Sequence, residues 1–256
     1  MIRSLADRVV VITGAASGIG QAVAKGFAAQ GSRVAILDRD VEGAEATAAA
    51  IRQAGGTAAA SACNIADRAD CSAAAAWVQE TFGAADALIN NAGVLLGAPV
   101  DADTFEAKWD LTQRVNVDGP MNMVRAFLAP LRASRGTIVN VSSSSAVLAA
   151  NGGTVYATSK GAISQLTKAL AVDLGPDGIR VNAIAPGPVK TPLNLGISGG
   201  VDITDRYLPR TPLNHIAVPE DLVGPFLFLA SPLASHVTGV ILTVDGGYTV
   251  TGFVAH

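Results

Sequence analysis

The sequence predicts an α/β fold in which helices cover both faces of a doubly wound parallel sheet of about seven strands. Short apolar runs rich in β-branched residues alternate with longer helical patterns along all 256 residues. A glycine-rich turn follows the first run, and polar or turn-forming residues follow the others. No linker or change of composition interrupts the alternation, so we expect one domain over residues 1–256.

The first predicted strand, residues 9–13, leads into the sequence GAASGIG at 14–20 and then into a helical pattern through Gln30. Glycines let the backbone approach a pyrophosphate closely, and the start of a helix favours its negative charge. This order predicts a Rossmann-type dinucleotide site. The spacing G-x-x-x-G-x-G matches the general fingerprint G-x-G-x-x-G only in part.

The second predicted strand, residues 33–37, ends in Asp38. A carboxylate at this position can accept hydrogen bonds from the ribose hydroxyls and would repel a 2′-phosphate. The sequence therefore favours NAD over NADP. Arg39 leaves NADP open, because a guanidinium beside the ribose could accommodate a phosphate or could be a solvated loop charge.

The third and fourth predicted strands, residues 57–62 and 87–89, also end in candidate cofactor contacts. Asn64, followed by Ile65, could hydrogen-bond the adenine edge or could instead cap the next helix. The sequence NNAG at 90–93 has small residues against which a cofactor can lie, although it is also an ordinary turn.

A possible proton-transfer centre follows the fifth predicted strand, residues 137–141. The next residues place Ser143 at the carboxyl edge of the sheet, and a helix through about Leu174 carries Tyr156 and Lys160 four residues apart on one face. A nearby ammonium favours ionisation of a phenol, and Ser143 could hydrogen-bond a substrate oxygen beside it. Taken alone, Y-x-x-x-K also occurs on exposed amphipathic helices.

The last two predicted strands are residues 181–185 and 240–244. The sequence PGPVKT at 186–191 follows the former, and its backbone and the Thr191 hydroxyl could contact a nicotinamide carboxamide. Taken alone, it is also a simple Pro/Gly loop.

These motifs together resemble the classical short-chain dehydrogenase/reductase family over essentially the whole chain, and the resemblance accounts for the glycine spacing. It implies a catalytic tetrad in which Tyr156 is the general acid/base and Ser143 polarises the carbonyl. Lys160 would lower the pKa of the phenol and bind the nicotinamide ribose, and Asn116 would position a water that links Lys160 to solvent. Asn64 stands where the family usually has Asp. The expected cofactor contacts are Gly14, Ser17, Gly18, Ile19, Gly20, Asp38, Arg39, Asn64, Ile65, Asn91, Ala92, Gly93, Tyr156, Lys160, Pro186, Gly187, Val189 and Thr191.

The expected function is NAD(H)-dependent interconversion of a secondary alcohol and its ketone, with a polyol, a hydroxy acid or a carbinol as substrate. An NADPH-dependent 3-oxoacyl thioester reductase is a second hypothesis, which Asp38 disfavours. A non-catalytic dinucleotide-binding regulator is a third, which has no chemical need for the tetrad. We expect a lid at residues 192–218 and a substrate pocket lined by Ser143, Ser145, Tyr156, Val94, Leu95, Val147, Asn151 and Gly152.

Composition argues against several other classes of protein. A net charge of −3 without a basic run disfavours nucleic-acid binding. Residues 222–244 lack Asp, Glu, Lys and Arg, but prolines interrupt them, so no membrane span is expected. The two cysteines and three histidines lack metal-ligand spacing. The absence of a signal-peptide pattern predicts a cytoplasmic protein, and the apolar residues 248–256 predict a homo-oligomer, a tetramer as is common in the resembled family.

Overall fold

A computed structural model describes residues 5–197 and 202–251. Its sheet has seven parallel strands, as the sequence predicts, and their order is β3-β2-β1-β4-β5-β6-β7. The predicted strand limits agree with the observed ones to within one residue at each end. The strands are β1 (Val9–Thr13), β2 (Arg33–Asp38), β3 (Thr57–Ala62), β4 (Ala87–Asn90), β5 (Thr137–Val141), β6 (Arg180–Pro186) and β7 (Ile241–Val244).

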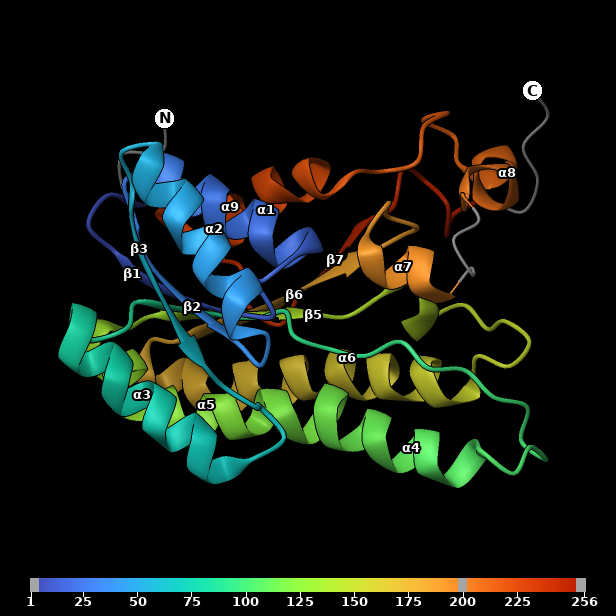
Figure 1. Ribbon diagram of the computed structural model, residues 1–256, viewed down its shortest axis with the longest axis horizontal. Helices are drawn as coiled ribbons and strands as arrows, with labels where there is room; N and C mark the ends of the chain where they lie inside the picture. Colours follow the sequence, from blue (N-terminus) through green and yellow to red (C-terminus); the bar gives the residue numbers. More distant parts are fainter. Residues whose placement is uncertain (1–4, 198–201, 252–256) are drawn as a thin grey trace.

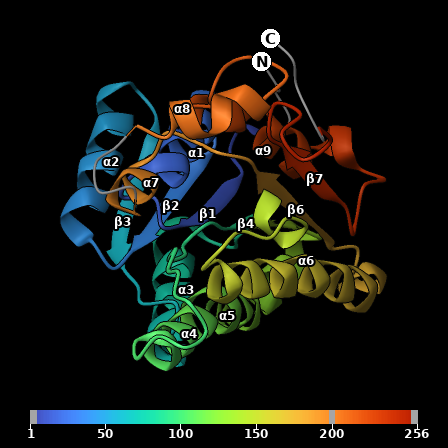
Figure 2. The ribbon, with the colours of Figure 1, turned by 90° about the vertical axis from the view of Figure 1, so that its right-hand side faces the viewer.

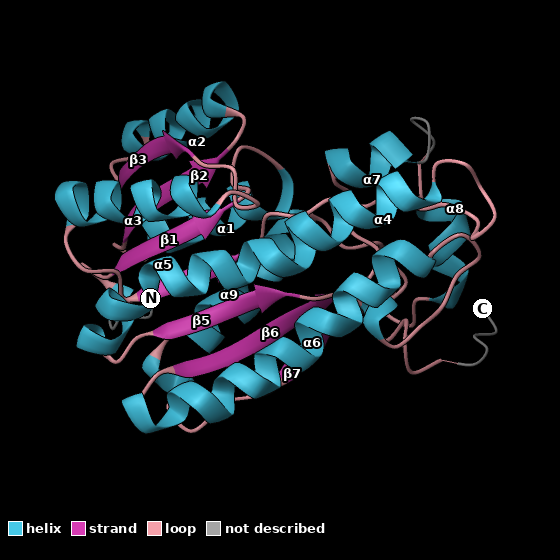
Figure 3. Cartoon of the chain, turned by 90° about the horizontal axis from the view of Figure 1, so that it is seen from below, coloured by secondary structure: helices cyan, strands magenta, loops and turns pink. Residues whose placement is uncertain are grey.

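Helices cover both faces of the sheet (Figures 1 and 2). On one face lie α1 (Gly18–Ala29), α2 (Val41–Gln53) and α9 (Val223–Ala230). On the other lie α3 (Arg68–Phe82), α4 (Phe105–Gln113), α5 (Gly119–Ser134) and α6 (Thr154–Leu174). The short helices α7 (Pro192–Ile197) and α8 (Thr204–Tyr207) lie beyond the carboxyl ends of the strands (Figure 3). Within the described chain, no helix combines the length and the apolar character that crossing a membrane requires.

The core consists of two apolar layers separated by the sheet. All five residues of β1 are buried, and alternate ones face opposite layers. Val10 and Ile12 share a cluster with Phe27 and Phe226, whereas Val11 belongs to the cluster that contains Phe127. Burial on both faces explains why the parallel strands appear in the sequence as continuous apolar runs rather than as alternating ones.

The strand order reverses between β1 and β4, which are neighbours in the sheet although β2 and β3 intervene in the chain. The connections after β1 and β4 therefore run to opposite faces, and a crevice opens between them at the carboxyl edge. In doubly wound sheets this reversal is where ligands bind.

A chain of buried amide and hydroxyl groups fixes α6 against the centre of the sheet. Asn90 Nδ2 donates to Asn140 Oδ1 at 2.9 Å, and Asn140 Nδ2 donates to Thr167 Oγ1 at 2.9 Å. Thr167 Oγ1 in turn donates to the Ile163 carbonyl at 2.8 Å. Because buried polar groups are costly without partners, this chain holds α6 in one position on β4 and β5.

Replacing Thr167 by Val should lower the free energy of unfolding by about 1–3 kcal/mol, because it leaves the buried Asn140 Nδ2 without its acceptor. Urea unfolding would measure the loss. Thr167→Ser keeps the hydroxyl and should lose less. A Thr167→Val variant as stable as the wild type would show that the buried chain does not hold α6.

Candidate active site

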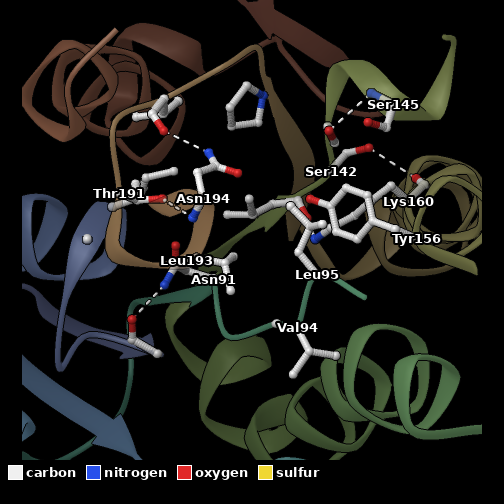
Figure 4. A pocket seen from close by; sticks show the side chains of 18 of the residues that line it. Asn91, Val94, Leu95, Ser142, Ser145, Tyr156, Lys160, Thr191, Leu193 and Asn194 are labelled. Atoms are coloured by element: carbon white, nitrogen blue, oxygen red, sulfur yellow. Dashed lines mark hydrogen bonds between the residues drawn. The ribbon is translucent and has the colours of Figure 1, made fainter. Parts of the chain in front are cut away.

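A cavity of about 670 Å³ opens at the carboxyl edge of the sheet. Residues that follow each of the seven strands line it, together with residues of the 192–210 segment. Of the expected cofactor contacts only Gly20 does not line this cavity, of the expected substrate residues only Val147 and Gly152 do not, and of the tetrad only Asn116 does not. Figure 4 shows Tyr156 and Lys160 on one side of the cavity and Thr191, Leu193 and Asn194 on the other.

The turn after β1 is packed so tightly that two of its glycines, Gly14 and Gly20, have no room for a side chain. Gly14 has a φ of +68°, and a Cβ added to it would lie 2.6 Å from Ala92 Cα. A Cβ on Gly20 would lie 2.3 Å from the Gly14 carbonyl oxygen, so Gly20 supports the turn from behind. The N-cap of α1, Ser17, makes no side-chain capping bond. The turn therefore offers backbone N–H groups to an anion and fits a pyrophosphate.

Asn91 fastens this turn to β4. Its Nδ2 donates to the carbonyls of Thr13 and Gly14 at 2.9 and 2.8 Å. The Thr13 hydroxyl accepts from the backbone N–H groups of Asn91 and Ala92, each at 3.1 Å. Sequence reasoning missed Thr13 as a connector, although a hydroxyl at the end of an otherwise apolar strand was a signal.

Where β2 ends, the cavity wall contains a carboxylate whose position is fixed. Asp38 accepts from the backbone N–H groups of Ala16 and Asp40, each at 3.0 Å. Arg39 lines the cavity beside it and forms no ion pair within the described ranges. Asn64 accepts from Ala66 N at 3.2 Å, whereas α3 is capped by Asp67, so the helix-capping interpretation of Asn64 was wrong.

The possible proton-transfer centre lies where β5 meets α6. Lys160 is 5% exposed, and its Nζ donates to the Val141 carbonyl at 2.7 Å and lies 5.6 Å from the centre of the Tyr156 ring. Ser143 accepts from Ser145 N at 3.0 Å, which fixes its hydroxyl. The Ser142 hydroxyl donates to the Lys160 carbonyl at 3.1 Å and so ties the turn to α6.

Burial sets the pKa values of this centre. It raises the pKa of Tyr156 to about 12, and the hydrogen bond with the Ser143 hydroxyl only partly opposes it. Burial also lowers the pKa of Lys160 from 10.5 to about 8. Burial outweighs the expected lowering of the Tyr156 pKa by Lys160 in this structure, because removal from water disfavours the charged form of both groups.

Asn116 lies in a π-helical turn, Arg114–Asp118, and its side chain clamps the backbone beside the cavity. Its Oδ1 accepts from Val94 N at 2.8 Å, and its Nδ2 donates to the Val94 carbonyl at 2.8 Å and to Ser159 Oγ at 3.0 Å. The side-chain amide is thus committed to protein partners. The family resemblance implies that Asn116 positions a water. Because its side chain already has protein partners, the backbone of Asn116 in the π-turn would have to hold that water.

The residues that line the cavity near Tyr156 differ in part from the expected substrate pocket. Val94, Leu95, Ser145 and Asn151 line the cavity, but Val147 is 77% exposed and does not. Gly152 does not line it either; its carbonyl accepts from Ala98 N. Lining residues that sequence reasoning did not name include Ser144, Leu148, Ala149, Ala150 and Tyr248, whereas Ile203, Arg206, Tyr207 and Arg210 come from the expected lid segment.

Tyr248 could have been found, because it follows β7 at the same edge of the sheet. Cys63 is buried in the apolar layer that contains Val11 and Phe127. In the part of the chain that the structure describes, no three His, Cys, Asp or Glu side chains gather where they could hold a metal ion.

Replacing Lys160 by Met should show how burial of the ammonium affects stability. Below pH 8 the wild type keeps this group charged in both states and bears the whole burial cost, of the order of a few kcal/mol. As pH rises from about 8 to 10.5, the folded protein binds fewer protons than the unfolded chain, and the cost disappears. The free energy of unfolding of Lys160→Met should therefore exceed that of the wild type by the largest amount below pH 8. This excess should decrease steadily as the pH rises to 10.5.

Chemical unfolding at several pH values would measure this difference. Lys168→Met is the matched control, because Lys168 is an exposed lysine of the same helix. A difference that does not change with pH would contradict the burial of a charged Lys160.

Comparisons with known proteins identify the family of the chain. The family model described as enoyl-(acyl carrier protein) reductase matches residues 14–249. The D-threitol dehydrogenase of Mycolicibacterium smegmatis is 38% identical over 96% of this chain and 94% of its own length. The galactitol 2-dehydrogenase (L-tagatose-forming) of Cereibacter sphaeroides is 40% identical over 93% and 94%.

Among solved structures, a gluconate 5-dehydrogenase from Burkholderia cenocepacia in complex with NADP and tartrate has a TM-score of 0.91 and 35% identity, and the match covers 98% of both chains. The chain therefore belongs to the short-chain dehydrogenase/reductase family, and it is an oxidoreductase of the short-chain alcohol dehydrogenase type.

Proposed function

We propose that the protein interconverts a secondary alcohol and its ketone with NAD(H), and that Tyr156 is the general acid/base. The observation that carries this proposal is that Tyr156 and Ser143 line the same cavity, with the buried Nζ of Lys160 5.6 Å from the centre of the Tyr156 ring. A bound nicotinamide dinucleotide would supply or accept the hydride. The side chains of the protein supply orientation and proton transfer.

In the direction of oxidation, ionised Tyr156 accepts the proton of the substrate hydroxyl, and in reduction the phenol returns it. Ser143 holds the substrate oxygen at the same place, because its own hydroxyl is fixed by Ser145 N. Lys160 stabilises the phenolate and binds ribose hydroxyls. The backbone of Asn116 would hold the water that connects Lys160 to solvent.

The cofactor would lie along the turns that line the cavity. The glycine turn at 14–20 would hold its pyrophosphate, and Asn64, Ile65 and the 91–93 turn would contact the adenine and the adjoining groups. Residues 186–191 would contact its carboxamide. The fixed carboxylate of Asp38 supports NAD, whereas the NADP in the solved relative and the position of Arg39 favour the other cofactor.

The names of the relatives, which include threitol, galactitol and gluconate dehydrogenases, support polyols or hydroxy acids as substrates. The segment 192–210 contributes residues to the cavity and supports the proposal of a lid. A homotetramer and a cytoplasmic location stay predictions. Residues 252–256, on which the predicted subunit contact partly rests, lie outside the described residues.

Replacing Tyr156 by Phe should lower kcat by at least about 10²–10⁴-fold, because the ring remains but the proton-transfer hydroxyl is lost. Absorbance at 340 nm would follow turnover, and titration of cofactor fluorescence would show that binding survives. Near-normal turnover of a secondary alcohol by this variant would refute the mechanism.

Replacing Asp38 by Asn should shift the ratio of kcat/KM for NAD to that for NADP toward NADP, because it removes the charge that repels a 2′-phosphate. The shift should correspond to one to a few kcal/mol, or about tenfold or more. The companion variant Arg39→Gln should move the ratio the other way. Faster turnover with NADPH by the wild type would instead support the oxoacyl thioester reductase.

A further inference from the structure

We infer that Arg206 and Arg210 form a subsite for an oxyanion, so that the substrate is a secondary alcohol that also carries a carboxylate or a similar anionic group. The inference rests on the proposed function and narrows its substrate class. Both arginines line the same cavity as Tyr156 and Ser143. They come from α8 and the following turn, Leu208–Arg210, beyond the carboxyl ends of the strands (Figure 3).

Two tyrosines hold the guanidinium groups in place. The Cζ of Arg206 lies 5.2 Å from the centre of the Tyr207 ring, and that of Arg210 lies 4.9 Å from the centre of the Tyr248 ring. The two rings pack edge to face, with centres 5.7 Å apart and planes at 76°. An aromatic face attracts a guanidinium without using its N–H donors. Those donors remain able to bind a carboxylate through two parallel hydrogen bonds.

Acidic groups do not neutralise this pair. In the described ranges neither arginine forms an ion pair. Asp202 lies instead 3.4 Å from Lys190, and Asp245 accepts from the N–H groups of Gly247 and Thr249 and from the Thr249 hydroxyl.

The distribution of charge along the cavity gives the anion its place. Asp38 is the only carboxylate among the described lining residues, and it lies at the adenosine end beside Arg39. Lys160 is buried at the proton-transfer centre. The remaining charges of the cavity are the two arginines, so its substrate end is positive and attracts an anion.

A substrate that uses both features would place its hydroxyl at Tyr156 and Ser143 and its anionic group at the arginines. Hydroxy acids have this pair of groups, whereas neutral polyols and simple carbinols gain nothing from the guanidinium charges. Of the three substrate classes that the sequence leaves open, the cavity therefore favours hydroxy acids.

The test compares each acid with its own neutral N-methylamide. The substrates are 3-hydroxybutyrate, 4-hydroxypentanoate, 5-hydroxyhexanoate and gluconate, and kcat/KM is measured for each acid and amide with NAD and with NADP. The wild type should prefer at least one acid over its amide by about tenfold or more. The variants Arg206→Gln and Arg210→Gln should reduce that preference, and the double variant should abolish it while turnover of the amide persists.

The control is Arg125→Gln, which removes the same charge from an exposed residue of α5 outside the cavity and should leave the preference unchanged. Arg210→Glu should reverse the preference toward a matched amino alcohol. A wild type that turns over acids and amides equally, or a double variant that keeps the preference, would overturn the subsite.

Two further results separate this inference from its alternatives. If the arginines bind cofactor phosphates instead, the double variant should weaken NAD binding for every substrate, and that result would overturn the anionic-substrate assignment. Failure of the proposed function would look different, because no alcohol, charged or neutral, would then be oxidised by the wild type in a Tyr156-dependent way.

Discussion

The arrangement of the site depends on one buried interaction, the hydrogen bond from the Lys160 ammonium to the carbonyl of Val141. Among the described residues no carboxylate forms an ion pair with this lysine, and burial lowers its pKa to about 8. Such a group destabilises the folded state, so the surrounding fold must hold it in place. Two hydrogen bonds hold α6, which carries Lys160, against the end of β5. The Ser142 hydroxyl donates to the Lys160 carbonyl, and the Asn140 amide donates to the Thr167 hydroxyl.

The parallel sheet brings the other parts of the site to the same place. Each strand ends at one edge, so a glycine turn, a carboxylate, a serine and the start of α6 meet there although they are far apart in the sequence. The reversal of strand order between β1 and β4 opens the crevice. The Asn91 amide joins β4 to the glycine turn there through hydrogen bonds to the Thr13 and Gly14 carbonyls. The segment that carries Arg206 and Arg210 adds a positive end to a cavity whose other end contains Asp38.

The sequence predicted the sheet well because strands buried on both faces form short continuous apolar runs with turn residues after them. The same rule located the motifs that line the cavity. It could not predict that Asn116 clamps Val94, that Leu148 lines the cavity in place of Val147, or that burial outweighs Lys160 in setting the pKa of Tyr156. These features depend on how distant segments pack, and neither spacing nor composition records packing.

The most direct test of this account is a titration of Lys160 by NMR. The chain has only five lysines, so protein labelled with ¹³C at the lysine ε-carbon gives few signals, and Lys160→Met identifies the relevant one. The account predicts that this signal titrates near pH 8, below the ordinary lysine value of 10.5. Titration of Lys160 near 10.5 would show that the ammonium is solvated and would contradict the account.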